Sequence, residues 1–421
     1  MHRVVITGIG IASPIGCGRD TFWPHLVAGQ SGVGAITLFD ASAFPVRIGG
    51  EVKDPDIDSV VKEFPKSRSV RDRKVFLALL AAQEALADSH MKESDLCGAL
   101  LYTGVGLEVF WLDDLTPYAH SADVGEALAT LLPASMGTQL LQTPLDCTSN
   151  ILGERYGFSA GKYINCSACV AGAQVVGEAW EMLREGQTAI ALAGATDSML
   201  NPLGLGGFSL LRVLSDENEE PQRACRPFDA SRKGTVLGEG AAFIVMETLE
   251  NALKRRAGVY AEIIGYGSSM DAFRVSDPDD TGKGAVQSMT SALKSARLQP
   301  SDVDCINAHA TGTIKNDIVE TAAIKEVLGE HAYHISVHSV KSMTGHMIAA
   351  SGAVEAVASV MTISKKQIPP TINLTKADAQ CDLDYVSDGP REFAGDTVLS
   401  NSFGFGGQNA TLIFKRYENG F

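Results

Sequence analysis

The segment that decides the surrounding fold reads Asn165-Cys166-Ser167-Ala168-Cys169-Val170-Ala171-Gly172. A short apolar strand signal, Tyr163-Ile164, precedes it, and apolar residues at helical spacing follow it. This order predicts a strand, a tight turn and a helix, with Cys169 where the helix begins. Free N–H groups and the positive end of a helix dipole stabilise an anion at that position. We therefore expect the Cys169 thiol to ionise more easily than a free thiol and to act as a nucleophile.

Two other interpretations of this cysteine are open at this point. A buried cysteine is most often a small hydrophobic residue of the core. Cys166 and Cys169 also form a C-x-x-C pair, which is typical of a redox centre or of half a zinc site. A zinc site needs a second pair of ligands. We expect no metal, because the other cysteines are scattered singly: Cys17, Cys97, Cys147, Cys225, Cys305 and Cys381.

The composition of the chain is that of an ordinary globular protein. Its 421 residues are 45% hydrophobic and 20% charged, which suggests roughly two or three domain-sized units. The formal net charge of -15 argues against general nucleic-acid binding. Eight unpatterned cysteines and an N-terminus that begins directly with a strand favour the reducing cytoplasm. We expect no membrane insertion, since no apolar run approaches the roughly 20 residues that span a bilayer.

Strand and helix signals alternate along the whole chain. This alternation predicts an α/β protein with mostly parallel, buried sheets. The expected strands include residues 4–7, 99–102, 189–193, 242–246, 261–264, 305–308, 334–337 and 397–400.

An internal repeat indicates that the α/β unit is duplicated. A helix, a Ser-Asp turn and a strand follow one another in residues 85–102 and again in residues 292–308. Gly172-Ala173 and Gly352-Ala353 open a second pair of similar helices. We predict two halves, residues 1–255 and 256–421, with extra residues at about 107–160 in the first half. Chance similarity of amphipathic helices is the alternative.

A basic run stands out on this acidic chain, just before a segment that predicts a buried helix. It is either a solvated face or a docking patch for an acidic partner. Its candidate docking residues are Lys66, Arg68, Arg71, Arg73 and Lys74.

Two histidines lie in glycine-rich segments after predicted strands, where open sheets place their sites. His309 lies in Asn-Ala-His-Ala-Thr-Gly-Thr, and His346 ends Lys-Ser-Met-Thr-Gly-His. The last such loop, Asn401 to Asn409, holds glycines around two phenylalanines. It is either a tight hairpin, a moving gate, or a source of N–H groups for an oxyanion.

Together these motifs resemble the elongating β-ketoacyl-[acyl-carrier-protein] synthases. Cys169, His309 and His346 match the Cys-His-His set of that family, and the similarity runs nearly end to end. Further matching motifs are Arg226-Pro227-Phe228-Asp229, Gly238-Glu239-Gly240-Ala241 and Asn401 to Gly407. The resemblance implies a thiolase fold, in which two βαβαβαββ halves form five αβαβα layers, and usually a dimer.

The resemblance also implies a role for each matching residue. Cys169 carries the acyl chain as a thioester, and His309 and His346 stabilise the enolate left when a malonyl thioester loses carbon dioxide. Backbone N–H groups of Cys169 and Phe405 hold the tetrahedral oxyanion, and Phe405 is also a gate. Lys341 and Glu320 orient the histidines, Thr311 and Thr313 hold pantetheine, and Phe110 and Trp111 line the acyl tunnel.

The implied partner is an acyl carrier protein, which would dock on the basic run and deliver acyl chains on its phosphopantetheine, with no cofactor held by the chain. Either a homodimer or a heterodimer with a chain-length-factor-like homologue is expected. The segments 316–323 and 329–333 look more like type II polyketide or polyene subunits, whereas Asn401 to Gly407 looks more like the fatty-acid enzymes. We lean to the polyketide side, with housekeeping fatty-acid elongation as the alternative.

Other classes of protein remain alternatives. A non-catalytic chain-length partner subunit is disfavoured because the chain keeps both histidines and the cysteine. A thiol hydrolase or redox protein is disfavoured by the basic run. Cys166 departs from the family pattern, and we interpret it as a passive thiol rather than an oxidation partner of Cys169.

Overall fold

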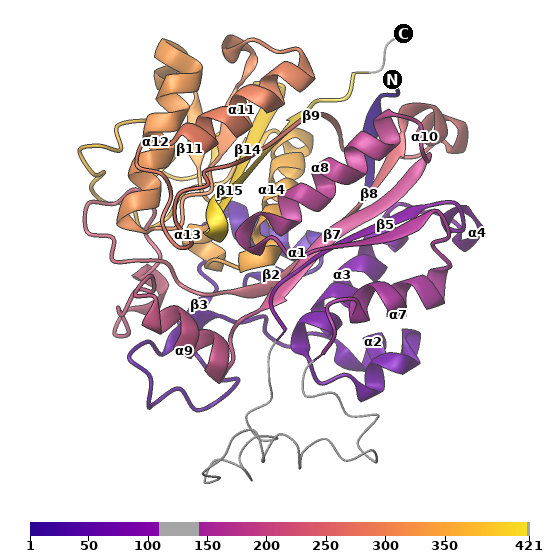
Figure 1. Cartoon of the computed structure of the whole chain (residues 1–421), viewed down its shortest axis with the longest axis horizontal. Helices are drawn as coiled ribbons and strands as arrows, with labels where there is room; N and C mark the ends of the chain where they lie inside the picture. Colours follow the sequence, from indigo (N-terminus) through magenta and orange to yellow (C-terminus); the bar gives the residue numbers. More distant parts are fainter. Residues whose placement is uncertain (109–142, 419–421) are drawn as a thin grey trace.

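A computed structural model describes residues 1–108 and 143–418 (Figure 1). The predicted tunnel residues Phe110 and Trp111, and much of the predicted 107–160 insert, lie outside the described residues.

Two consecutive parts of the chain have the same order of elements, β-α-β-α-β-α-β-β. The first is β1 (Val4–Ser13), α3 (Arg73–Asp88), β5 (Leu100–Val105), α7 (Cys147–Tyr156), β6 (Gly161–Asn165), α8 (Ala171–Arg184), β7 (Ile190–Ser198) and β8 (Glu239–Thr248). The second is β9 (Ala261–Met270), α11 (Lys283–Ala296), β10 (Cys305–Asn307), α12 (Ile314–Leu328), β11 (Ser336–His338), α14 (Ser351–Lys365), β14 (Thr397–Gly404) and β15 (Gln408–Lys415). The duplicated thiolase-like fold is therefore confirmed.

Shorter elements lie within these two parts, and α10 lies between them. The helices are α1 (Arg19–Val27), α2 (Ile57–Glu63), α4 (Glu93–Leu96), α9 (Pro202–Leu210), α10 (Leu249–Arg255) and α13 (Lys341–Thr344). The strands are β2 (Gly16–Cys17), β3 (Val33–Ala35), β4 (Ile48–Gly50), β12 (Gln367–Ile368) and β13 (Arg391–Glu392).

The main sheet is mixed, so the prediction of mostly parallel strands is wrong. Its order is β11-β10-β14-β15-β9-β1-β8-β7-β5-β6, with β2 beside β1. The strands β6, β5 and β7 are parallel, as are β11, β10 and β14, but the strands between them pair antiparallel. In the second half a tight hairpin joins β14 to β15, and such a turn makes the two strands antiparallel. In the first half β8 returns antiparallel to β7 after a longer connection that holds α9, and β1 pairs antiparallel with both β8 and β9.

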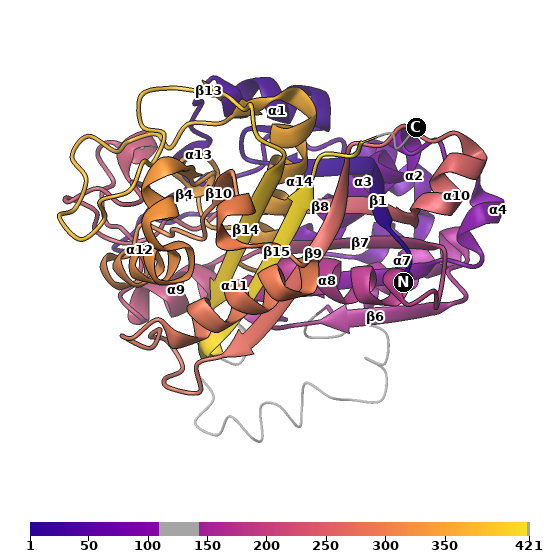
Figure 2. The ribbon, with the colours of Figure 1, turned by 90° about the horizontal axis from the view of Figure 1, so that it is seen from above.

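The helices and sheets form five layers. Figure 1 shows α11 and α12 on one side of the molecule, α3 and α7 on the opposite side, and α8 with α14 between them. Figure 2 shows the same arrangement from above, with β14, β15 and β9 running side by side and α11 packed against β9 and β15. The central helices contact each other and both parts of the sheet.

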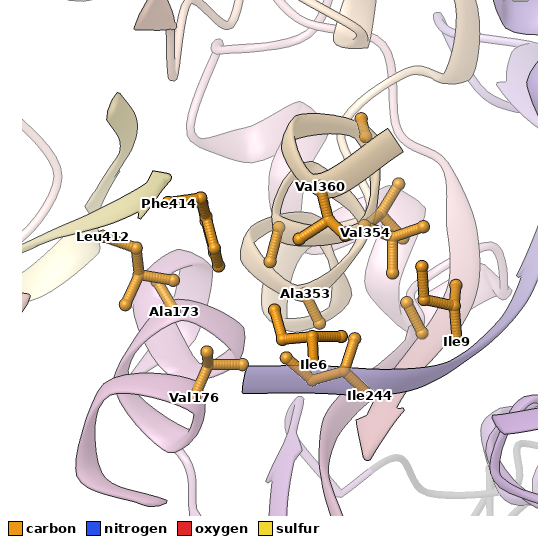
Figure 3. Close-up of a cluster of buried hydrophobic side chains, with 14 of the residues drawn as sticks. Ile6, Ile9, Ala173, Val176, Ile244, Ala353, Val354, Val360, Leu412 and Phe414 are labelled. Carbon is orange, nitrogen blue, oxygen red and sulfur yellow. The ribbon is translucent and has the colours of Figure 1, made fainter. Parts of the chain in front are cut away.

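The central layer carries a core that both halves share (Figure 3). Ile6 and Ile244 reach it from the first half and Phe414 from the second, and all three are almost fully buried. They pack around small residues of the central helices, such as Ala173 and Ala353. Burying each large apolar side chain contributes roughly 1.5–3 kcal/mol, so this layer holds the two halves together.

The two glycines of the predicted repeat, Gly172 and Gly352, lie against each other in the structure. A Cβ on Gly172 of α8 would lie 2.5 Å from the backbone nitrogen of Ala353, and a Cβ on Gly352 would lie 2.5 Å from that of Ala173. Real Cβ atoms do not approach so closely, so only glycine allows this contact. The N-terminal ends of α8 and α14 therefore meet at the middle of the molecule, where their dipoles favour an anion.

One segment passes the length and hydropathy test for a membrane span. The 18 residues from Ile348 to Lys365 have a mean hydropathy of 1.2, but 89% of the segment is buried inside the protein. We assign it to the core as the central helix α14, together with the turn before it.

Candidate active site

The predicted cysteine and both histidines lie on one cavity of about 340 Å³. They come from different parts of the chain: Cys169 precedes α8, His309 follows β10, and His346 follows α13. Thr311, Thr313, Phe403 and Phe405 also line this cavity. The structure therefore brings together residues that the sequence separates widely.

Cys169 lies in a short 3-10 turn, η4 (Ala168–Val170), just before α8. The preceding residue, Ala168, has a φ of 51°, a left-handed backbone conformation that costs energy in a residue other than glycine. This sharp turn places a buried cysteine on the wall of the cavity.

The resting thiol does not ionise as easily as the sequence suggests. Burial raises the pKa of Cys169 to about 11, while the backbone N–H of Phe405 and the charge of Lys341 act in the opposite direction. The prediction of a lowered pKa is therefore wrong for this state, because removal from water outweighs the helix dipole.

His309 is held from both its backbone and its ring. Glu320 accepts hydrogen bonds from the backbone N–H groups of His309, at 2.8 Å, and of Ala310, at 2.7 Å. The Lys341 ammonium lies 3.3 Å from His309 Nδ1, where it can only donate. This contact selects the tautomer with the ring proton on Nε2.

His346 is held in a similar way by Ser351. Its Nδ1 lies 2.8 Å from Ser351 Oγ, which also accepts the Met347 N–H at 3.0 Å. The serine hydroxyl proton is then available to His346 Nδ1, and this again places the ring proton on Nε2.

The two imidazoles form an edge-to-face pair, with ring centroids 5.3 Å apart and an interplanar angle of 85°. Burial lowers the pKa of both rings well below the ordinary value, and the Lys341 charge adds to this effect. Both rings are therefore neutral near pH 7, and neutral imidazoles can donate one N–H each to a developing negative charge.

The buried acid that pairs with Lys341 is Glu355 on α14, a residue that the sequence reasoning missed. Lys341 and Glu355 are both almost completely buried and form an ion pair. Burial raises the pKa of Glu355 to about 7, although Lys341 lowers it. The signal was a single glutamate inside the apolar helix Ser351–Lys365, where a charge has to find a partner. Glu320, the predicted orienting acid, instead holds the His309 backbone.

The glycine-rich loop is a tight hairpin between β14 and β15, closed by the short turn η9 (Phe405–Gly407). Gly404 lies so close to Cys169 that an added Cβ would be 3.3 Å from the Cys169 nitrogen. The Phe405 ring stacks on Phe208 of α9, with centroids 6.0 Å apart. The hairpin thus provides the Phe405 N–H to the Cys169 thiol and an aromatic side chain to the cavity.

A second loop fixes this hairpin from outside. The Asp271 N–H donates to the Gly407 carbonyl at 2.7 Å, and its carboxylate accepts the Asn409 amide at 2.7 Å. The Gly406 N–H donates to the Val275 carbonyl at 2.7 Å.

Thr311 and Thr313, the predicted pantetheine-binding residues, lie on the cavity wall. Their hydroxyl oxygens lie 3.0 Å apart.

The basic run is only partly a surface feature. Lys66, Arg68 and Arg71 are exposed, but Lys74 is 3% exposed and Arg73 forms an ion pair with the buried Glu239 at 2.7 Å. The assignment of Arg73 and Lys74 to a docking patch is wrong, because both side chains neutralise interior carboxylates.

The two cysteines of the C-x-x-C pair lie in different surroundings. Among residues 1–108 and 143–418, no group of three or more His, Cys, Asp or Glu side chains is arranged to hold a metal ion. Cys166 is exposed, and its sulfur lies 3.8 Å from the Gly106 carbonyl oxygen.

Comparison with known families now identifies the chain. The family model for the "Beta-ketoacyl synthase, N-terminal domain" matches residues 1–252. The model for the "Beta-ketoacyl synthase, C-terminal domain" matches residues 260–375. The chain belongs to the β-ketoacyl synthase family. It is therefore an acyltransferase that carries out the condensation of that family.

Full-length relatives agree with this assignment. The chain is 40% identical to the 3-oxoacyl-[acyl-carrier-protein] synthase 2 of Synechocystis sp., covering 99% of this chain and 98% of the relative. It is 41% identical to the protein of the same name from Coxiella burnetii, covering 99% of each.

Solved ketosynthases share the fold. The ishigamide ketosynthase/chain length factor aligns with a TM-score of 0.86 at 30% identity, over 99% of this chain and 100% of that chain. A type II polyketide ketosynthase bound to a hexaketide, in complex with its acyl-carrier protein, aligns with a TM-score of 0.84 at 31% identity, over 99% and 100%.

Proposed function

We propose that this β-ketoacyl synthase elongates acyl chains on an acyl carrier protein in type II fatty-acid synthesis. The pathway assignment is supported by identities of 40% and 41% to two 3-oxoacyl-[acyl-carrier-protein] synthases 2, against 30% and 31% to the polyketide structures. The lean of the sequence motifs towards a polyketide pathway is thus less well supported than its alternative.

The first step is acyl transfer to Cys169. The thiol attacks the carbonyl carbon of an acyl-pantetheine thioester, a new C–S bond forms, and the pantetheine sulfur leaves and takes up a proton. The oxyanion of the tetrahedral intermediate accepts hydrogen bonds from the backbone N–H groups of Cys169 and Phe405. Because the resting thiol has a pKa of about 11, its proton leaves only as the substrate supplies a sulfur to receive it.

The second step is decarboxylation and condensation. A malonyl thioester loses carbon dioxide and leaves an enolate. The enolate oxygen accepts hydrogen bonds from the Nε2–H groups of His309 and His346. The enolate carbon attacks the acyl-Cys169 carbonyl and forms a C–C bond. The C–S bond breaks, and the Cys169 thiolate that leaves takes up a proton from water. This chemistry needs no cofactor held by the chain.

The observation that carries this proposal is the pair of neutral imidazoles on the same cavity as Cys169. In each ring Nδ1 accepts a hydrogen bond, in His309 from Lys341 and in His346 from Ser351. The ring proton is then on Nε2, and each histidine can donate this Nε2–H to an enolate. A charged imidazolium could protonate the enolate carbon as well as its oxygen. Protonation at carbon would give an acetyl thioester and prevent the condensation.

The test uses the purified chain with acyl and malonyl carrier-protein thioesters. The 3-oxoacyl product is expected for saturated acyl chains, and Cys169→Ala is expected to remove acylation and condensation. Cys166→Ala is the matched control and should keep turnover within a few-fold. Condensation only in the presence of a co-expressed homologue would favour a polyketide pair, and absence of acyl transfer to the wild type would refute the proposal.

We propose that the carrier protein docks on the exposed cations Lys66, Arg68 and Arg71. Lys66 pairs with the exposed Glu154, and such surface pairs are weak enough for a partner carboxylate to compete. A shallow groove of about 600 Å³ lies beside Lys66 and Arg68, between η1 (Pro65–Ser69) and α7. Lys66→Glu and Arg68→Glu should raise KM for the acyl carrier, whereas the exposed control Lys254→Glu should not.

We propose a dimer, with the edge of β6 as part of its interface. Within the described residues β6 pairs only with β5, and its Tyr163 and Ile164 are 42% and 40% exposed. Unpaired strand edges with apolar side chains favour association. Sedimentation should give a dimer that Ile164→Lys weakens, and a monomeric wild type would count against it. A homodimer fits the fatty-acid role, and a chain-length-factor-like partner remains the other outcome.

Two further assignments are kept as proposals. The division into residues 1–255 and 256–421 is supported by the repeated order of elements, in which β9 restarts the pattern after α10. A cytoplasmic location is proposed from the unpaired cysteines.

A further inference from the structure

One face of the central helix α8 carries acidic side chains that the chemistry described above does not use. Glu178 and Glu181 lie about one turn apart, and Gln174 lies one turn before Glu178, so the three side chains share one face. Glu178 is half-buried and Glu181 is exposed, whereas Ala179 and Trp180 between them are buried in the core. Glu178 and Glu181 therefore form an acidic face where α8 meets solvent.

This acidic face is continuous with the edge strand β6. The side-chain amide of Asn165, the last residue of β6, donates to Gln174 Oε1 at 3.1 Å and to Glu178 Oε1 at 3.4 Å. Tyr163 lies on the same side of β6 as Asn165 and stacks on Tyr102 of β5, with ring centroids 4.5 Å apart. Figure 2 shows β6 running beside α8, and the two elements are in contact. The edge of β6 and the acidic face of α8 therefore form one surface.

The cation that follows this face along α8 does not form an ion pair with it. Arg184 lies one turn beyond Glu181, but its guanidinium lies 4.8 Å from the Trp180 ring and its Nε lies 3.0 Å from the Met1 sulfur. Burial and the charge of Glu185 raise the pKa of Glu181, although Arg184 lowers it. The acidic face therefore keeps a net negative charge.

The neighbouring strand does not neutralise this face either. Lys162 of β6 points to the other side of the sheet, where its ammonium donates to Asn150 of α7 at 3.0 Å. Among the residues that the structure describes, no Lys or Arg forms an ion pair with the acidic face. Residues 109–142 and 419–421 contain no Lys or Arg in their sequence. A cation for this face therefore has to come from another chain.

A second copy of this chain would bring like charges together at this surface. Dimers of identical chains are symmetric, so a patch at the interface meets the same patch of the other copy. When two β6 edges pair antiparallel, the two-fold axis is perpendicular to the joined sheet, and both α8 helices lie on the same side of that sheet. The Glu178 and Glu181 carboxylates of both copies then share one interface, where like charges oppose association. Basic side chains at these positions in the other chain would replace this repulsion with attraction.

We propose that the surface formed by the β6 edge and the acidic face of α8 pairs best with a homologous chain that carries Lys or Arg in place of Glu178 and Glu181. A second copy of this chain can still occupy the surface, as the weaker partner. The inference names the preferred partner of the dimer proposed above and rests on that dimer, but not on the proposed reaction or pathway.

The experiment uses a charge-reversed copy of this chain as the basic partner. The wild-type chain and the variant Glu178→Lys/Glu181→Lys carry different fluorophores, and energy transfer between them gives the dissociation constant of the mixed dimer. The same titration is run for each chain with itself, at about 0.05 M and about 0.5 M salt. The matched control is Glu326→Lys/Glu330→Lys, which makes the same change of charge at exposed positions of α12 and of the turn that follows it.

The mixed dimer should be the tightest of the pairs. At low salt its dissociation constant should be at least about tenfold below that of either self-dimer, because each self-dimer brings like charges together. At high salt the charges are screened, so this difference should shrink. The control variant should pair with the wild type within about threefold of the wild-type self-dimer, since its new cations lie far from the interface.

Other outcomes overturn the inference or separate it from the proposed function. Equal dissociation constants for the mixed and wild-type dimers, or an equal gain from the control variant, would overturn it. If the charge-reversed chain does not fold, Glu178→Gln/Glu181→Gln decides instead: its self-dimer should be tighter than that of the wild type, and an unchanged self-dimer would overturn the inference. A mixed dimer that Ile164→Lys does not weaken would place the interface elsewhere and also overturn it. A preference for the mixed dimer in a chain that fails to condense thioesters would support this inference and remove the proposed function.

Discussion

The buried ion pair behind His309 gives the sharpest prediction. Lys341→Met removes the ammonium that donates to His309 Nδ1 and neutralises Glu355. Without that donor the ring proton can move to Nδ1, and Nε2 then offers a lone pair rather than an N–H to the enolate. Decarboxylation should fall by about 10²–10³, as for the loss of one oxyanion donor, while acyl transfer to Cys169 should fall less.

The stability change follows from the same contacts. Leaving one partner of a buried pair costs about 3–5 kcal/mol, and we expect about 3 kcal/mol at pH 7 because Glu355, with a pKa of about 7, can take up a proton. In the variant the pKa of Glu355 rises further, since Lys341 no longer lowers it. The folded state then holds a proton that the unfolded chain releases, so stability should keep falling above pH 7 by up to about 1.4 kcal/mol per pH unit.

The double variant Lys341→Met/Glu355→Gln separates stability from chemistry. It should recover much of the lost stability and its pH dependence above 7, because no uncompensated acid remains, but it should not recover decarboxylation. Urea unfolding at pH 7 and 9 measures the first effect, and release of carbon dioxide from a malonyl thioester measures the second. If the double variant regained decarboxylation, or lost acyl transfer equally, the tautomer argument would be wrong.

Three further predictions test other parts of the site. His309→Ala and His346→Ala should spare acyl transfer more than decarboxylation, and equal loss of both half-reactions in either variant would count against the enolate role. Gly172→Ala should destabilise the fold by at least about 1–3 kcal/mol, the usual cost of overpacking, whereas Gly98→Ala, whose Cβ meets nothing within 4 Å, should not change the urea midpoint by a comparable amount. Asp271→Ala should free the glycine-rich hairpin and speed hydrolysis of the acyl-enzyme when no malonyl thioester is present; an unchanged hydrolysis rate would show that this contact does not hold the hairpin closed.

Much of the fold could be predicted because its signals are local. Apolar runs and helical spacing located the strands and helices, and the Ser-Asp turns marked the repeat. Both turns are capped alike, with Asp95 accepting the Lys92 N–H and Asp302 accepting the Gln299 N–H. The cysteine and histidines were predicted because they lie in short motifs at strand ends.

The features that the sequence did not reveal depend on tertiary contacts. Arg73 and Lys74 look like surface cations until Glu239 and Asp72 are seen beside them. The pairing of Lys341 with Glu355 requires α13 and α14 to be placed against each other. The thiol pKa depends on how completely water is excluded around Cys169, and no local motif records that exclusion.

The close contact at Gly172 and Gly352 joins two segments that are 180 residues apart in the sequence. A larger side chain at either position requires the backbone of the other segment to move. Substitutions at one position should therefore be tolerated only together with compensating changes at the other. The same contact implies that a fragment carrying the nucleophile alone would lack the surface that seats it, and that reactivity appears only once both repeats have come together.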